Sequence, residues 1–247
     1  MNAGPHEIHV WLAFDRDIGG PHALVHERLL TPEETARRDK LHFEHDRHQF
    51  LVTRALQRLV LSEYASAVAP RDWRFAAGER GKPALTAEFA AHGLHFNLAH
   101  TPGLAAFAVS KLPGLGVDVE NSRTRTTPLH LAKRYFTDAE VRALDALPPD
   151  ERPARFFALW TLKESWLKAT GQGLAAGLGN ASFELDETHR LRRVEFLTDD
   201  AGRWRFWQFA PSSDHVLALG LLSASTPPAV TVKFKNFPAD LTGTRKF

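Results

Sequence analysis

Cysteine is absent from this chain of 247 residues. The chain can therefore form neither disulfides nor thiolate metal sites, and nothing in it calls for an oxidising compartment. Long apolar runs are also missing, since no segment approaches the roughly 18 consecutive apolar residues of a membrane-spanning helix. The opening residues, MNAGPHEIHVWLAF, lack the charged and apolar regions of a secretion signal. We therefore expect a cytoplasmic protein with no membrane partner.

A strong excess of charge of either sign is missing too. The 31 Lys and Arg residues nearly balance 29 Asp and Glu residues, which leaves a net charge of +2. This balance does not favour nucleic acid as a partner, because such binding rests on many cationic contacts to phosphates. Apolar residues make up 43% of the chain, enough for the core of one large domain or two small ones.

The stretch GLGVDVE (114–120) places two carboxylates in what is otherwise a buried strand. Side chains alternate along a strand, so Asp118 and Glu120 share one face while Val117 and Val119 share the other. The two acids lie roughly 6 to 7 Å apart along the backbone. Like charges this close destabilise each other unless a proton, a cation or water intervenes. Of these three, a hard divalent cation bound between the two carboxylates is the most specific hypothesis.

The first half of the sequence alternates predicted strands with one long helical stretch. Residues 8–14, 94–100 and 104–110 have strand-like patterns, and residues 31–64 read as helical with Thr31 as a plausible N-cap. A solvated face is the ordinary explanation for the cations of this helical stretch. They are Arg37, Arg38, Lys40, Arg47, Arg54 and Arg58.

The second half repeats this rough order of strand, loop and long helix, followed by strand-like runs at 203–210 and 215–223. This is a hint of duplication only, because we find no repeat at the level of residues. Pro and Gly between two apolar strands place a boundary near residues 111–114. We therefore expect two parts, 1–112 and 113–247.

The helix predicted in RPARFFALWTLKESWLKATGQGL (152–174) carries the most chemical information. Trp160, Glu164 and Lys168 are four residues apart in turn and form one line along the helix, with Lys163 beside it. Gly171 and Gly173 suit the helix end. Taken alone, Glu164 and Lys168 would be an ordinary exposed ion pair worth a few tenths of a kcal/mol.

The strand and this helix together resemble the 4′-phosphopantetheinyl transferases. The signature of that family is G-[IV]-D-[IV]-E followed by W-x-x-K-E-x-x-x-K, and GVDVE and WTLKESWLK match both parts without a gap. Two further stretches, GKP (81–83) and FNLAH (96–100), are similar to other motifs of the family. Several ordered motifs are far more specific than one. The two-half layout is similar to the larger class, which activates peptide and polyketide synthases.

The resemblance implies both a fold and a reaction. The fold is an α+β pseudo-dimer of two similar subdomains, each a small sheet packed on a long helix, in one monomeric chain with coenzyme A in the cleft between them. The reaction moves the 4′-phosphopantetheine arm of coenzyme A to a serine of an apo carrier protein and releases adenosine 3′,5′-bisphosphate. The implied partners are thus coenzyme A and an acyl or peptidyl carrier protein.

The resemblance also implies roles for the acidic and basic side chains. Asp118 and Glu120 would bind Mg²⁺, with Mn²⁺ equally suited to hard oxygen ligands. Glu164 would be a third ligand, the general base for the serine hydroxyl, or both. Lys168 would neutralise the leaving side of the pyrophosphate, and Lys163 would reach a neighbouring phosphate oxygen.

At the adenosine end, the resemblance implies that Lys82 and His100 contact coenzyme A phosphates and that Arg37 binds the 3′-phosphate. Two residues depart from the family pattern. Ala99 replaces a common serine before the histidine, and Glu34 stands where some relatives carry lysine. The residues that bind the 3′-phosphate in the family therefore cannot all be transferred to this sequence.

Other functions compete with transfer. A metal-dependent nuclease or phosphodiesterase would also use strand acids with Glu and Lys on a helix, but it would be expected to bind nucleic acid. A non-catalytic module would use the carboxylates as a structural cation site, although an intact base candidate at Glu164 argues against it. A glycosidase pair is the least favoured, because two acids on one strand face do not flank a sugar bond.

Overall fold

The computed structural model describes residues 1–18, 26–77, 82–123, 129–171, 177–197, 201–226 and 229–238. Gly81 and Gly173, which the motifs singled out, lie outside the described residues. The chain divides into two compact units. The first contains Met1–Ala76, Pro83–Lys111 and Val230–Phe247, and the second contains Ala77–Lys82 and Leu112–Ala229. Residues 230–238, which the sequence division assigned to the second part, thus lie in the first unit.

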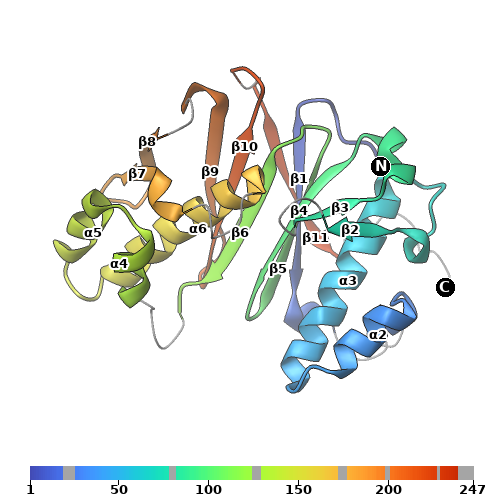
Figure 1. The fold of residues 1–247 in the computed structure, drawn as a ribbon. Coiled ribbons are helices and arrows are strands. Elements are labelled where there is room, and N and C mark those ends of the chain that lie inside the picture. The colour runs from blue at the N-terminus through green and yellow to red at the C-terminus, as the bar shows by residue number, and fades with distance from the viewer. Residues whose placement is uncertain are drawn as a thin grey trace. The chain divides into compact units, whose positions relative to one another are not determined.

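The first unit is built on a four-stranded sheet in the order β11-β1-β5-β4 (Figure 1). β1 (Glu7–Phe14) pairs antiparallel with β5 (Leu104–Ser110) and parallel with β11 (Thr231–Phe237). β4 (His95–Thr101) pairs antiparallel with β5. The alternating patterns correctly predicted β1, β4 and β5. A separate two-stranded sheet joins β2 (Phe75–Ala77) to β3 (Pro83–Leu85).

The helical stretch of the first unit is two helices, α2 (Pro32–Asp39) and α3 (Glu44–Tyr64), so the prediction of one continuous helix is wrong. Thr31 caps α2, as predicted, and its side chain accepts a hydrogen bond from the Glu34 amide. At the break, Arg47 Nη1 donates to the carbonyls of Leu41 and His42 at 3.0 and 3.2 Å. These side-chain bonds replace the helical bonds lost there, and no Gly or Pro marks the break in the sequence.

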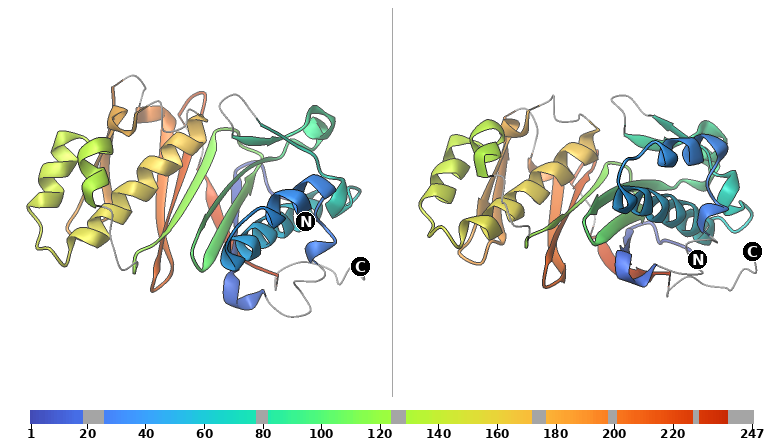
Figure 2. Two further views of the ribbon diagram at one scale, coloured as in Figure 1. Left: turned by 60° about the horizontal axis from the view of Figure 1, so that its bottom comes forward. Right: turned by 90° about the horizontal axis from the view of Figure 1, so that it is seen from below.

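The second unit places one long helix on a three-stranded sheet. The antiparallel sheet has the order β6-β10-β9, and Figure 2 shows α6 lying against it in both views. A separate hairpin joins β7 to β8. The elements are β6 (Leu115–Asn121), α4 (Ala132–Tyr135), α5 (Asp138–Asp145), α6 (Arg152–Thr170), β7 (Ala181–Leu185), β8 (Leu191–Phe196), β9 (Trp204–Ser212) and β10 (His215–Leu222).

Two glycines allow α6 to rest directly on the sheet. Gly116 of β6 and Gly220 of β10 are partners in register. A Cβ atom built on Gly116 would lie 2.0 Å from the carbonyl oxygen of Ser165 and 2.5 Å from the amide of Ala169. The backbone of Gly116 therefore touches the backbone of α6, and a residue with a side chain would not fit at this position. α6 ends at Gly171, whose φ of 68° suits the predicted left-handed cap.

Each unit therefore pairs a small sheet with one long helix, which confirms the α+β prediction of two similar subdomains. α3 packs on β1 and β5 in the first unit, as α6 does on β6 and β10 in the second. Among the described residues, no helix has both the length and the apolar character needed to cross a membrane.

Candidate active site

Asp118 is a buried carboxylate at the centre of the second unit. Because side chains alternate along β6, Asp118 shares the face of Gly116 and points toward α6. Its side chain is 7% exposed, and its Oδ1 accepts a 2.6 Å bond from Lys168 Nζ. Its Oδ2 is buried and has no hydrogen-bond partner among the described residues. Burial raises the pKa of Asp118, and the nearby Lys168 ammonium opposes that shift.

Glu164 lies on α6 one turn before Lys168 and beside the same carboxylate. Burial, and after it the negative charge of Asp118, raises the pKa of Glu164 to about 7, while Lys168 acts in the opposite direction. The charge of Asp118 thus acts on Glu164, and Lys168 acts on both carboxylates. The structure thus brings Asp118 together with Glu164 and with Lys168, which is 50 positions away in sequence.

Glu120 stands on the same face of β6 as Asp118 but farther toward the end of the strand. It is half-buried and pairs in register with Val216 of β10. Within the described ranges, no group of three or more His, Cys, Asp or Glu side chains is gathered closely enough to hold a metal ion. The positive charge beside Asp118 in this structure is the Lys168 ammonium.

Lys163 does not take the place that the motif implied. Its side chain is fully buried, and its Nζ lies 2.8 Å from Glu140 Oε2. The same Nζ donates to the carbonyls of Leu178 and Ala181 at 2.9 and 2.6 Å. All of its donors are therefore used inside the protein, and the expectation that it contacts a coenzyme A phosphate is corrected. Lys163 immediately precedes Glu164 on α6, and neighbouring residues of a helix point to different faces.

Lys82 lies in the second unit, beside the start of β6 and the end of α6. Its Nζ donates to the carbonyl of Leu115 at 2.9 Å and to that of Ala169 at 3.4 Å. Burial lowers the pKa of Lys82 to about 8. The ammonium is thus within the same unit as the carboxylates, near the glycine contact that fixes α6.

Arg37 and His100 both belong to the first unit. Arg37 lies on α2, is exposed, and places its guanidinium 6.0 Å from the centre of the Phe50 ring. His100 lies on β4 and its side chain is exposed. Ala99, the departure from the family motif, is buried on the same strand. Arg37 and His100 are thus exposed side chains of the first unit.

Glu34 has a role that the sequence reasoning missed. Its carboxylate accepts a 3.0 Å bond from the Thr31 amide and so completes a capping box with Thr31. It also forms a 2.9 Å ion pair with Arg58. The signal was present in the sequence, since Thr31 and Glu34 have the T-x-x-E spacing of a capping box. Glu34 is therefore occupied in the fold.

Comparison with known proteins identifies the class to which this site belongs. The model of the 4′-phosphopantetheinyl transferase superfamily matches residues 114–220, and that of the N-terminal part of 4′-phosphopantetheinyl transferases matches residues 21–112. The 4′-phosphopantetheinyl transferase HetI of Nostoc sp. is 32% identical over 223 residues, which cover 90% of each chain. The chain therefore belongs to the 4′-phosphopantetheinyl transferase superfamily.

More distant relatives agree. The 4′-phosphopantetheinyl transferase Sfp of Bacillus subtilis is 31% identical over 184 residues, which are 70% of this chain and 79% of the relative. The L-aminoadipate-semialdehyde dehydrogenase-phosphopantetheinyl transferase of Xenopus laevis is 27% identical over 212 residues, 80% of this chain and 70% of the relative. The protein is an enzyme of this family, which transfers the 4′-phosphopantetheinyl group from coenzyme A to carrier proteins.

Proposed function

We propose that the enzyme moves the 4′-phosphopantetheine arm to a serine hydroxyl of its apo carrier protein and releases adenosine 3′,5′-bisphosphate, with Mg²⁺ held at Asp118, Glu120 and Glu164. The observation that supports this is the close approach of α6 to β6, which brings Glu164 and Lys168 to Asp118. Phosphoryl transfer depends on positioning and on neutralisation of charge, and this group of side chains supplies both.

The side chains fit a hard cation. All three are carboxylates, and the buried Oδ2 of Asp118 lacks a partner among the described residues, as an atom awaiting a ligand would. Mg²⁺ usually takes only a few carboxylates and completes its shell with substrate phosphate oxygens. The three carboxylates therefore need not be gathered around one point before Mg²⁺ and coenzyme A bind. When bound, the ion would neutralise charge on the pyrophosphate, and Mn²⁺ would suit the same oxygens.

Glu164 and Lys168 carry the proton and charge of the reaction. Glu164 accepts the serine proton, directly or through one water, as the serine oxygen bonds to the pyrophosphate phosphorus nearer the pantetheine. The bond from that phosphorus to the bridging oxygen breaks, and its electron pair leaves with adenosine 3′,5′-bisphosphate. The Lys168 ammonium stabilises the negative charge that develops on the leaving oxygen.

The remaining phosphates of coenzyme A are assigned to three other side chains. Arg37 would bind the 3′-phosphate, and Lys82 and His100 would contact other phosphate oxygens. Lys163 is left out of this group because its ammonium is used inside the protein. We further propose that the enzyme acts as a monomer in the cytoplasm on a carrier that is acidic around its serine.

The test is direct transfer. The enzyme is incubated with coenzyme A, Mg²⁺ and a panel of apo acyl and peptidyl carrier proteins, and mass spectrometry measures the added arm on each carrier. We expect transfer to at least one carrier, loss of transfer with EDTA, and recovery when Mg²⁺ is restored. Asp118→Ala and Glu164→Ala should each abolish transfer in a folded protein. Turnover that persists in either variant removes that residue from the mechanism.

A further inference from the structure

Each unit contains an ion pair between the glutamate of a short helix's capping box and a buried cation of the long helix. In the first unit, Thr31 and Glu34 form the capping box of α2, and Glu34 pairs with Arg58 of α3. Arg58 is 1% exposed. Its Nη1 also donates to the carbonyls of Pro70 and Trp73 at 3.2 and 2.9 Å, in the segment that follows α3.

The second unit repeats this arrangement with different residues. Thr137 and Glu140 form the capping box of α5, and Glu140 pairs with Lys163 of α6. Lys163 also donates to the carbonyls of Leu178 and Ala181, in the segment that follows α6. We call Thr137, Glu140 and Lys163 the second lock, and Thr31, Glu34 and Arg58 the first lock.

The two locks agree in a further detail. The Arg58 guanidinium lies 5.4 Å from the centre of the Phe75 ring, and Lys163 Nζ lies 5.8 Å from that of Phe183. Each of these rings belongs to the strand that follows the long helix. The cation follows the capping carboxylate by 24 positions in the first lock and by one fewer in the second. This is the residue-level repeat that sequence comparison did not find, because Arg stands for Lys and the spacing differs.

The locks differ in the residue that comes next along the long helix. Arg58 is followed by Leu59, which is buried in the core, whereas Lys163 is followed by Glu164. The second lock is thus one residue from a side chain of the proposed site. We infer that the second lock is a positioning device, which fixes α6 so that Glu164 and Lys168 meet Asp118; this inference rests on the proposed function.

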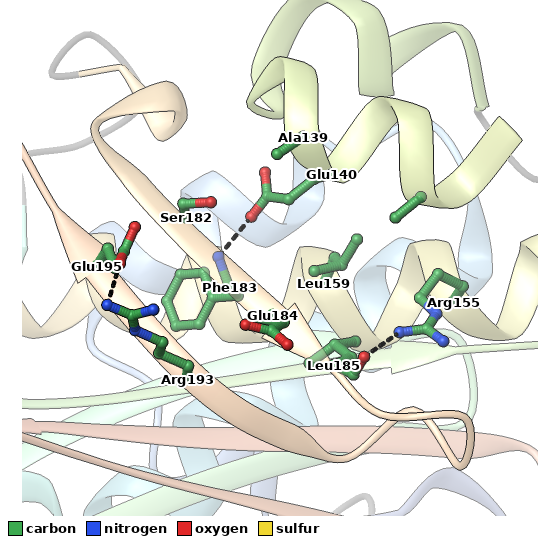
Figure 3. A pocket seen from close by; sticks show the side chains of 11 residues that line it. Ala139, Glu140, Arg155, Leu159, Ser182, Phe183, Glu184, Leu185, Arg193 and Glu195 are labelled. Atoms are coloured by element: carbon green, nitrogen blue, oxygen red, sulfur yellow. Dashed lines mark hydrogen bonds and ion pairs between the residues drawn. The ribbon is translucent and has the colours of Figure 1, made fainter. Parts of the chain in front are cut away.

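One carboxylate of the second lock joins three elements. Glu140 Oε1 accepts a 2.8 Å bond from the Phe183 amide of β7, which Figure 3 shows as a dashed line. Its Oε2 accepts from the Thr137 amide and pairs with Lys163. Arg155 of α6 adds a 3.0 Å bond to the carbonyl of Leu185. Glu140 and Arg155 thus form hydrogen bonds with the backbone of β7 at Phe183 and Leu185, and so connect this strand to α5 and α6.

Apolar packing alone does not fix this region. A cavity of about 310 Å³ lies between α5, α6, β7 and β8, beside Glu140 (Figure 3). Leu144 of α5 and Phe183 of β7 belong to one apolar core cluster, but the cavity interrupts the packing beside it, so the polar bonds of Glu140 add to what holds α5 and β7 together. A buried ion pair contributes little net stability, because desolvation of both charges offsets their attraction. Its effect is therefore expected in geometry more than in stability.

The test separates positioning from phosphate binding and from simple stability. We compare wild type with Glu140→Gln, Lys163→Met and the double variant, and measure kcat, KM for coenzyme A and melting temperature. Both single variants bury an unpaired charge, so we expect a lower melting temperature and a kcat reduced about 10- to 100-fold. The KM for coenzyme A should stay within about twofold of wild type, because Lys163 does not touch the substrate.

The double variant decides between the alternatives even where a single variant fails to fold. With both charges gone, its melting temperature should return toward wild type, while kcat stays low because the bonds to Leu178 and Ala181 are still missing. If kcat recovers together with stability, the second lock is only structural and the inference is wrong. A rise in KM on loss of Lys163, with unchanged kcat, would make Lys163 a phosphate ligand and would also overturn the inference.

The first lock supplies the matched control. Glu34→Gln makes the same chemical change in the same kind of capping box. It should lower the melting temperature by a similar amount, and kcat at saturating coenzyme A should stay within about twofold of wild type. An equal loss of kcat in Glu34→Gln and Glu140→Gln would contradict a special role for the second lock. Absence of transfer by the wild type would refute the proposed function instead, so the two failures are distinguishable.

Discussion

At the scale of single residues, two neighbouring side chains of α6 lie in different surroundings: Glu164 lies beside Asp118, whereas Lys163 is buried against Glu140. Asp118, Glu164 and Lys168 were predicted from a strand pattern, a helical spacing and a family motif, and they lie together. Lys163 belongs to the same motif, yet it points into the protein. A motif gives the order of residues, whereas the face of the helix that is buried depends on contacts with Glu140 and β7, which no local pattern reveals.

Asp118 should combine a loss of activity with no loss of stability when its charge is removed. Burial raises the pKa of Asp118, which means that the charged form is costly in the folded protein. Asp118→Asn should therefore melt no lower than wild type, while transfer falls by at least about 10²- to 10³-fold. Calorimetry and the transfer assay test the two parts. A large drop in melting temperature would contradict the view of Asp118 as a costly functional charge.

His9 should make the first unit sensitive to mild acid. It is buried on β1, with Nδ1 2.6 Å from the Tyr64 hydroxyl and Nε2 3.0 Å from Glu7. Burial lowers the pKa of His9 in spite of Glu7, with Lys233 and Lys235 acting in the same direction as burial. The unfolded chain then binds the proton more readily, so stability is complete above about pH 6.5 and declines as pH falls toward the folded pKa.

Thermal unfolding between pH 7.5 and pH 5 measures this loss. His9→Asn should show a flatter pH dependence over that range, because the titrating imidazole is gone. An equally steep profile in the variant would assign the acid sensitivity to other groups.

At the scale of elements, the helix α6 was predicted almost to its ends because its signals are local. Pro153 suits the first turn and Gly171 the left-handed cap, and both are present in the sequence. The break between α2 and α3 was missed because a side chain, Arg47, bonds the carbonyls there. The close packing of α6 on β6 was also invisible, since Gly116 alone does not reveal what approaches it.

Gly116→Ala should separate α6 from the sheet. The added Cβ would meet the backbone of Ser165 and Ala169, which cannot move as a flexible side chain would. We expect a loss of about 3 kcal/mol or more in the free energy of unfolding, together with loss of transfer. Gly179→Ala is the matched control in the same unit, because its Cβ would meet nothing within 4 Å. Comparable damage from both variants would refute the close contact as the cause.

At the scale of the whole molecule, the sequence predicted two similar halves. It did not predict that the last described strand, β11, pairs with the first, β1. Strand, loop and long helix recur in order, and that pattern is readable along the sequence. The parallel pairing of β11 with β1 joins residues from opposite ends of the described chain, and no local signal specifies such a partner.

A chain ending at Ala229 tests that pairing. Without β11, β1 becomes an edge strand with exposed backbone groups. We expect β1 amides to lose hydrogen-exchange protection while those of β6 keep theirs, because β6 belongs to the sheet of the second unit. Unchanged protection in β1 would show that β11 adds nothing to the first unit.

The position of β11 also bears on how the protein is made. β1, α3, β4 and β5 leave the ribosome long before residues 231–237 are translated. The sheet of the first unit therefore lacks its fourth strand, β11, during that time. During that interval one side of β1 is open to pairing with other chains. Biosynthesis of this enzyme is therefore expected to depend on protection of β1 in the nascent chain until residues 231–237 have been made.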